Sequence, residues 1–185
     1  LSPGGQRVYA AYRNYIYGCN KRLNAKTLDE ITVSLLFYSE KHKIDPRLVV
    51  AMIIAESDFN PKETSNKGAM GLGQIMPDEA RDHHISNPYD PIENVRASVN
   101  LLRMKLDLYG TGSSPARLTK EQIILALAAY NAGERAVERF RGIPPYDETR
   151  NYVQRALENL QVYRAAFDSP ALRIVSDMVG DKPAG

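Results

Sequence analysis

Several features that often reveal the class of a protein are scarce in this sequence. It has one cysteine, Cys19, so no disulfide can form within the chain. It has no tryptophan and only three histidines, and no two of these histidines have the i, i+4 spacing of a helical ligand pair. A metal site is therefore not expected. The longest apolar run covers residues 48–55, which is too short to span a bilayer.

The sequence also lacks an excess of charge of either sign. Its 24 basic and 22 acidic residues leave a formal net charge of +2, which gives no case for nucleic-acid binding and only a mild preference for acidic polymers. The hydrophobic content of 43% is that of an ordinary soluble globular chain. Because the sequence begins at Leu1 rather than Met, we expect a processed or trimmed chain whose secretory signal has been removed.

Strand signals are scarce as well, whereas helical periodicity is frequent. Apolar residues at helical spacing predict an all-α fold, with at most a very small β-hairpin near residues 64–76. Helices are expected over about 7–17, 27–42, 46–56, 91–109, 121–130, 134–140 and 147–167, with a short one after residue 77. We expect N-terminal helices in residues 1–44 to pack on the body of the domain, a catalytic domain in 45–167, and a tail in 168–185.

The predicted helix starts rest on capping residues. Thr27 with Glu30 forms a capping-box pattern, and Thr119 begins a second such pattern. Asp45 and Asp90 are each followed by proline, which favours the first turn of a helix. The helix over 121–130 is apolar on every side, so we expect it at the centre of the core. Its small residues are expected to pack closely against the helix that begins at Asp45.

One acidic residue, Glu56, follows the apolar run 48–55 on the buried side of its predicted helix. Burial disfavours the charged form of a carboxyl group, so its pKa should rise above the usual value of about 4.3. A carboxyl that stays protonated near neutral pH can act as a general acid. The alternative is a helix-terminal glutamate that turns out to water. Asp58 lies about 200° further round the helix, so it cannot face the same substrate.

Four short motifs surround Glu56 along the chain. They are Glu56-Ser57 with Phe59-Asn60-Pro61, Gly71-Leu72-Gly73-Gln74-Ile75-Met76-Pro77, Ala129-Tyr130-Asn131-Ala132-Gly133 and Glu148-Thr149-Arg150-Asn151-Tyr152-Val153. In this order they resemble the catalytic region of the soluble-lytic-transglycosylase family, which is related to goose-type lysozyme. The resemblance covers about residues 45–165. One departure is Gly73, where the family usually has methionine, so a side chain that lines the glycan groove is expected to be missing.

The resemblance implies a lysozyme-like fold and one chemistry. Glu56 would be the sole catalytic carboxylate, acting first as acid and then as base. It would cleave the β-1,4 bond between N-acetylmuramic acid and N-acetylglucosamine and form a 1,6-anhydro sugar, without a cofactor or metal. The implied partner is the glycan strand of peptidoglycan, and the implied location is the periplasm or cell envelope.

The resemblance also implies the neighbours of Glu56. The hydroxyl of Tyr130 or Tyr152 would orient the neutral carboxyl, because a phenol does so without adding charge. The other implied glycan-contact residues are Ser65, Gln74, Met76, Asn131 and Glu148. Other readings stay open for three of these seven residues. Tyr130 could belong to the core, Gln74 could bond to its own loop, and Glu148 could be a first-turn helix acid favoured by the macrodipole.

Three other functions are compatible with parts of the sequence. A goose-type hydrolase would need a second carboxylate about 5–5.5 Å or 6.5–9.5 Å from Glu56. We predict that none lies there, with Glu148 as the strongest challenger. A glycan-binding module without activity fits poorly, because the glutamate is intact. A cysteine peptidase using Cys19 and His42 has no supporting motif.

Overall fold

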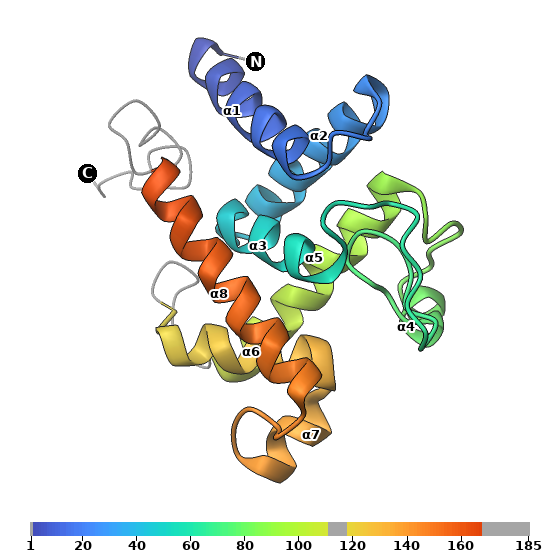
Figure 1. Cartoon of the computed structure of the whole chain (residues 1–185), viewed down its shortest axis with the longest axis vertical. Coiled ribbons are helices and arrows are strands. Elements are labelled where there is room, and N and C mark those ends of the chain that lie inside the picture. The colour runs from blue at the N-terminus through green and yellow to red at the C-terminus, as the bar shows by residue number, and fades with distance from the viewer. Residues whose placement is uncertain (1, 111–117, 168–185) are drawn as a thin grey trace, which may run out of the picture.

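The computed structural model describes residues 2–110 and 118–167, with the backbone alone over 163–167. This part of the chain folds into helices connected by short turns and one long loop (Figure 1). The helices are α1 (Pro3–Cys19), α2 (Ala25–Lys41), α3 (Pro46–Ser57), α4 (Pro77–Asp82), α5 (Pro91–Tyr109), α6 (Lys120–Ala132), α7 (Glu134–Phe140) and α8 (Asp147–Phe167). The prediction of an all-α fold is confirmed. The predicted tail, 168–185, and the loop 111–117 lie outside the described residues.

The long loop over residues 58–76 connects α3 with α4. Two isolated antiparallel bridges form in it, between Thr64 and Met70 and between Met70 and Ile75. They are the whole of the small hairpin expected near residues 64–76, and within the described residues no extended strand forms. The loop therefore holds its shape through turns and side-chain hydrogen bonds rather than through a sheet.

Helix α8 runs along the body of the protein and packs against both α3 and α6 (Figure 1). The other extensive pairs are α2 with α5 and α5 with α6. The predicted close packing of α6 against α3 is wrong, because α3 packs mainly against α8, whereas α6 packs against α5 and α8. The burial of α6 was predicted correctly, since Ala126, Leu127 and Ala128 are fully buried. An all-apolar helix must be covered, but its sequence does not say by which neighbours.

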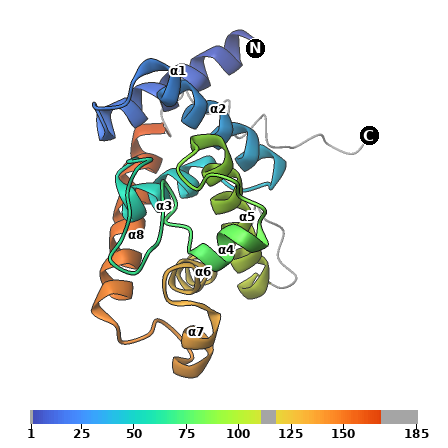
Figure 2. The ribbon, with the colours of Figure 1, turned by 90° about the vertical axis from the view of Figure 1, so that its right-hand side faces the viewer.

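The N-terminal helices share one apolar core with the rest of the protein. Val8, Tyr12 and Ile16 of α1 belong to the same buried cluster as Met52 and Ile53 of α3. In the side view, α1 and α2 lie at one end of the molecule and α7 at the other (Figure 2). The division at residue 44 stays a prediction. Among the residues described here, no helix is long and apolar enough to cross a membrane.

The predicted caps are mostly confirmed. Asp45, Asp90 and Thr119 each accept hydrogen bonds from backbone N–H groups of the first turn of α3, α5 and α6. The cap predicted at Thr27 is wrong, because α2 begins two residues earlier and Asn24 accepts from the Thr27 N–H at 2.9 Å. Asparagine is as good an N-cap as any residue, and it precedes the alanine that can start the helix.

Candidate active site

Glu56 lies in the last turn of α3, where the helix ends abruptly. Asp58 caps the helix in the left-handed conformation, with φ of 50°, and its N–H donates to the Ile54 carbonyl. The abrupt end places Glu56 beside the negative end of the helix dipole, which disfavours a second negative charge there. Although its carboxyl group is largely withdrawn from water, Glu56 as a whole residue keeps some exposed surface. A substrate can therefore reach it.

The environment of Glu56 favours its neutral form. Burial raises the pKa of Glu56 to about 8, and the negative charges of Glu79 and Glu148 add to this rise. Hydrogen bonding from Tyr152 and the positive charge of Arg155 oppose it. Because loss of hydration is the largest of these effects, the carboxyl group stays protonated at neutral pH without a charged partner. This confirms the direction expected from the sequence.

Tyr152 on α8 is the tyrosine whose hydroxyl interacts with this carboxyl. Its side chain is only 6% exposed, and burial together with the charge of Glu56 raises its own pKa well above the usual value. Its hydroxyl has no hydrogen-bond partner at ordinary geometry, although it approaches Glu56 closely enough to oppose the rise of the Glu56 pKa. Contacts of this kind are often long before substrate binds and tighten in the reacting complex.

Removing the Tyr152 hydroxyl gives a test of this role. In Tyr152→Phe the ring still fills its buried site, but the interaction of the hydroxyl with Glu56, which lowers the Glu56 pKa, is lost, so this pKa should rise above about 8. The descending limb of the profile of kcat/KM against pH should therefore shift to higher pH. The rate at neutral pH should fall by about 10–100-fold, which is the lower part of the range for a catalytic proton-transfer group. An unchanged limb in the pH–rate profile would contradict the assignment.

Tyr130 on α6 has a different partner. Its hydroxyl donates to the Gly73 carbonyl at 2.8 Å, and the charge of Glu56 contributes to raising its pKa. Tyr130 is therefore a neighbour of Glu56 whose hydroxyl hydrogen is used by the loop 58–76. The orienting role that the resemblance implies for Tyr130 or Tyr152 stays a prediction, and the Tyr152 hydroxyl is the one that does not donate to this loop.

Three buried polar residues support this loop, and the sequence analysis named only Ser57 among them, as part of a motif. Ser57 is buried beside Glu56 and donates from Oγ to the Leu72 carbonyl at 2.7 Å. Asn94 and Ser98 are buried on α5, and Asn94 Oδ1 accepts from the Gly73 N–H at 2.8 Å. The sequence did contain a signal for Asn94 and Ser98, because they are polar, spaced i, i+4 and lie beside the apolar stripe of a predicted helix. Polar groups buried at such positions need hydrogen-bond partners elsewhere in the fold.

The predicted glycan-contact residues of the loop also support its own fold. The Gln74 side chain donates to the carbonyls of Gly71 at 2.9 Å and Glu63 at 3.4 Å, and its backbone has a positive φ of 50°. Ser65 Oγ accepts from the Ala69 N–H at 3.0 Å. Met76 is 36% exposed just before α4. The side-chain amide of Gln74 thus bonds to its own loop, which was the alternative to glycan contact. Glycan contact by Ser65, Gln74 and Met76 stays a prediction.

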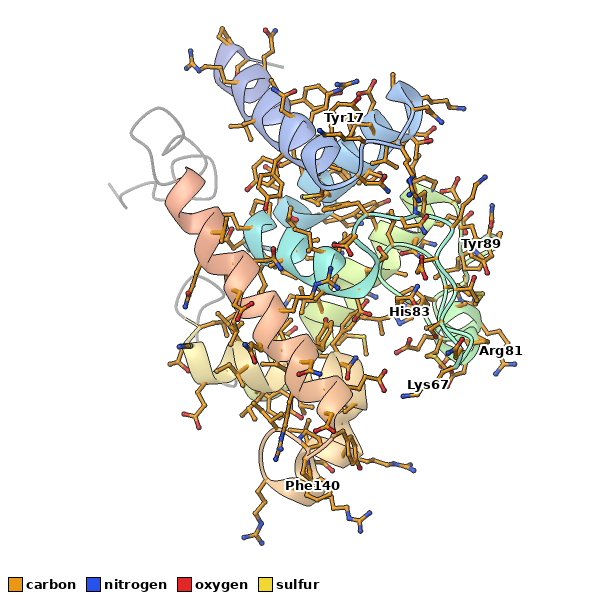
Figure 3. All side chains as sticks on the ribbon, viewed as in Figure 1. Tyr17, Lys67, Arg81, His83, Tyr89 and Phe140 are labelled. Atoms are coloured by element: carbon orange, nitrogen blue, oxygen red, sulfur yellow. The ribbon has the colours of Figure 1, made fainter. Side chains whose placement is uncertain are left out.

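The remaining two predicted residues lie where α6 ends and α8 begins. Asn131 Oδ1 accepts from the Thr149 hydroxyl at 2.8 Å, which connects the two helices. Glu148 is exposed and forms an ion pair with Lys67. Lys67, labelled in Figure 3, belongs to the loop 58–76, so this pair connects the loop with the start of α8.

With this geometry in view, comparison with known proteins identifies the family. The model of the transglycosylase SLT domain matches residues 35–153. The chain belongs to the SLT domain family. The SLT domain is 40% identical over 95 residues to a transglycosylase of Enterobacteria phage PRD1, which covers 51% of this chain and 32% of the relative. It is 30% identical over 141 residues to the membrane-bound lytic murein transglycosylase C of Mannheimia succiniciproducens, which covers 68% of this chain and 37% of the relative. The chain therefore spans about a third of these relatives.

Solved structures with the same fold are also lytic transglycosylases. The 70 kDa soluble lytic transglycosylase of Escherichia coli has a TM-score of 0.63 and 22% identity over 89% of this chain and 31% of its own. An inactive mutant of the lytic transglycosylase Slt of Pseudomonas aeruginosa has a TM-score of 0.60 and 24% identity, covering 75% and 24%. These likenesses establish that the SLT domain has the lysozyme-like fold.

The other carboxylates around Glu56 in this SLT domain have partners of their own. Glu79 accepts from the Met76 N–H at 3.0 Å at the start of α4, and Glu148 pairs with Lys67. Asp58 forms an ion pair with Arg155. None of the hydrogen bonds and ion pairs within the described residues joins a second carboxylate to Glu56. The charges of Glu79 and Glu148 reach Glu56 only as a repulsion that keeps it neutral.

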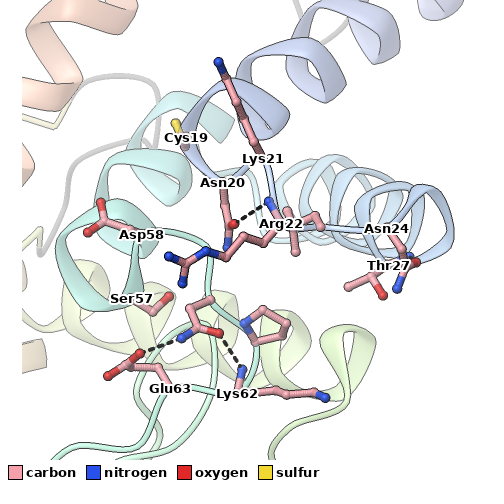
Figure 4. A pocket seen from close by; sticks show the side chains of 13 residues that line it. Cys19, Asn20, Lys21, Arg22, Asn24, Thr27, Ser57, Asp58, Lys62 and Glu63 are labelled. Atoms are coloured by element: carbon pink, nitrogen blue, oxygen red, sulfur yellow. Dashed lines mark hydrogen bonds between the residues drawn. The ribbon is translucent and has the colours of Figure 1, made fainter.

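A cavity of about 680 Å³ opens beside the SLT domain's α1–α2 turn, and Glu56 does not line it (Figure 4). Its walls include Cys19, Asn20, Arg22, Asp58 and Glu63. Burial raises the pKa of Cys19 to about 11, which leaves the thiol in its less nucleophilic protonated form at neutral pH. Within the described residues, no three His, Cys, Asp or Glu side chains cluster in a way that could hold a metal ion.

Proposed function

We propose that this SLT domain is a peptidoglycan lytic transglycosylase. In this proposal it cleaves the β-1,4 bond between N-acetylmuramic acid and N-acetylglucosamine and forms 1,6-anhydro-N-acetylmuramic acid. The observation that carries the proposal is a single buried carboxyl, Glu56, with a pKa of about 8 and with uncharged Tyr152 as its orienting neighbour. The names of the relatives, which include lytic murein transglycosylases, support the same reaction and a location in the cell envelope.

The reaction requires one group that donates a proton and then accepts one. Glu56 gives its proton to the glycosidic oxygen while the bond from that oxygen to C1 of the muramic acid breaks. The 2-acetamido group of the sugar stabilises the positive charge that develops at C1, as in substrate-assisted glycosidases. The Glu56 carboxylate then takes the proton of the C6 hydroxyl, and O6 bonds to C1. The carboxyl is protonated again, and no water is consumed.

The environment of Glu56 suits both steps. Before the reaction, loss of hydration keeps the carboxyl neutral and ready to donate. After donation, the Tyr152 hydroxyl can donate a hydrogen bond to the carboxylate without leaving a charge to be neutralised. Ser65, Gln74, Met76, Asn131 and Glu148 are proposed to contact the glycan on either side. Glu148 would have to exchange Lys67 for a sugar hydroxyl to do so.

The products decide between this function and hydrolysis. Purified peptidoglycan digested with the protein should release muropeptides that are lighter by one water molecule than hydrolytic products and that resist borohydride reduction, because their anomeric carbon is blocked. A digest with hen-type lysozyme serves as the hydrolytic reference. Reducible products of full hydrated mass would establish the goose-type hydrolase instead, and no release at all would favour a glycan-binding module.

A further inference from the structure

Gly73 is a glycine whose backbone conformation does not require one. Gly71 has a positive φ of 73°, in the region that favours glycine, whereas Gly73 does not belong to the positive-φ residues. The constraint at Gly73 is space. A Cβ added there would lie 2.6 Å from Ser98 Cβ, closer still to Ser98 Oγ, and 3.0 Å from the Tyr130 hydroxyl. The volume that any side chain at position 73 needs is already filled by Ser98.

Ser98 has little freedom to move away. It is fully buried in α5, and its Oγ is within hydrogen-bond distance of the Asn94 carbonyl, at 2.8 Å, and of Asn94 Oδ1, at 3.3 Å. Rotation of the hydroxyl would not remove the overlap with Ser98 Cβ, which is fixed by the helix backbone. Accommodation of a side chain at position 73 therefore requires movement of the loop or of α5.

Asn94 holds the backbone of the loop from the same side. Its Nδ2 donates to the carbonyls of Met70 at 3.0 Å and Pro88 at 2.7 Å, and its Oδ1 accepts from the Gly73 N–H. With 1% exposure, Asn94 makes these bonds away from water, where an unmade bond is costly. The carbonyl of Gly73 is fixed from the other side by Tyr130.

These contacts connect the loop with the surroundings of the catalytic acid. Ser57, the residue after Glu56, binds the Leu72 carbonyl, and Tyr130, a neighbour of Glu56, binds the Gly73 carbonyl. Gln74 and Met76 follow directly along the chain. A shift of Gly73 would therefore move the proposed glycan contacts relative to Glu56.

We propose that Ser98 and Gly73 are a coupled pair of positioning residues. In this pair the serine occupies the space that a side chain at position 73 would need, and Asn94, to which the serine is bonded, fixes the loop at its distance from Glu56. The proposal rests on the proposed function only for the consequence for glycan cleavage. The steric coupling concerns the fold and stands apart from the identity of the product.

A double-mutant cycle on stability tests the coupling. Overpacking a buried site should make Gly73→Ala lower Tm by roughly 5 °C in the natural background. Ser98→Gly alone should lower Tm by about 2–4 °C, since glycine weakens a helix interior. In the Ser98→Gly background, Gly73→Ala should cost less than about 2 °C, because the overlap with residue 98 is gone. Gly142→Ala, at a glycine whose Cβ would meet open space, should leave Tm unchanged.

Cleavage kinetics with soluble glycan fragments test the positioning role. They are measured far below Tm, and circular dichroism verifies that each variant is folded. Gly73→Ala should lower kcat/KM by about tenfold or more, as a displaced contact can do, and by less than about threefold in the Ser98→Gly background. A role confined to stability would leave kcat/KM of the folded variants unchanged, which would overturn the positioning role. Equal costs of Gly73→Ala in both backgrounds, or no cost in either, would overturn the coupled pair. The assay counts cleaved bonds, so hydrolytic products would refute the proposed function without touching this result.

Discussion

Glu56→Gln is expected to lower the rate of peptidoglycan cleavage by about 10³-fold or more, because one side chain serves both proton transfers and each is worth about 10²–10⁴-fold. Glutamine keeps the shape of the side chain but can neither donate an acidic proton nor accept one from the C6 hydroxyl. The variant should still fold and bind glycan strands. The measurement is the initial rate of soluble muropeptide release, with binding followed by sedimentation with insoluble peptidoglycan.

The matched control is Asp58→Asn, the same change of carboxylate to amide two residues away. Asp58 is exposed, pairs with Arg155 and has the left-handed conformation that asparagine tolerates well. An exposed ion pair contributes about 0–1 kcal/mol, so this variant should be nearly silent in rate and stability. A Glu56→Gln enzyme that kept more than about a tenth of the natural rate would end the single-carboxylate mechanism.

The second large effect concerns stability against pH. The pKa of Glu56 is raised in the folded protein to about 8, whereas in the unfolded chain it is near 4.5. Between these values the folded state binds the extra proton, so the stabilisation is complete below about pH 4.5 and is lost as the pH rises through about 8. Glu56→Gln removes this loss because its amide does not titrate.

The free energy of unfolding of Glu56→Gln should therefore increase relative to that of the natural protein as the pH rises. The difference in free energy of unfolding should grow in favour of Glu56→Gln from about pH 4.5 to 8 and reach a few kcal/mol, since each unit of pKa shift corresponds to about 1.4 kcal/mol. Urea unfolding at pH 5, 7 and 9 measures it, with Asp58→Asn expected to follow the natural protein. Parallel curves for the variant and the natural protein would show that the carboxyl is not withdrawn from water.

The elements that the sequence predicted well are those decided by local chemistry. Asp45 and Asp90 mark helix starts because a carboxylate followed by proline satisfies first-turn N–H groups without any distant contact. The N-cap of α2 was predicted at Thr27 instead of Asn24, because both residues are good N-caps and the local sequence does not decide between them. The raised pKa of Glu56 was predictable because this residue ends an apolar helix on its buried side.

The contacts between distant segments were not predictable in the same way. That α6 is buried follows from its composition, but its packing on α5 and α8 rather than on α3 depends on the path of the whole chain. Likewise Ser98 and Gly73 are 25 residues apart, and nothing local to either residue indicates that they compete for one space. Such a pair becomes visible only when the loop and α5 are placed side by side.

The overlap between positions 73 and 98 also limits how this protein can be redesigned. A methionine at position 73 and a serine at position 98 cannot share the present backbone, because even the Cβ of residue 73 would collide with the serine. A side chain at position 73 therefore has to be introduced together with a smaller residue at position 98, so the two positions have to be varied as a pair in any library that reshapes this loop.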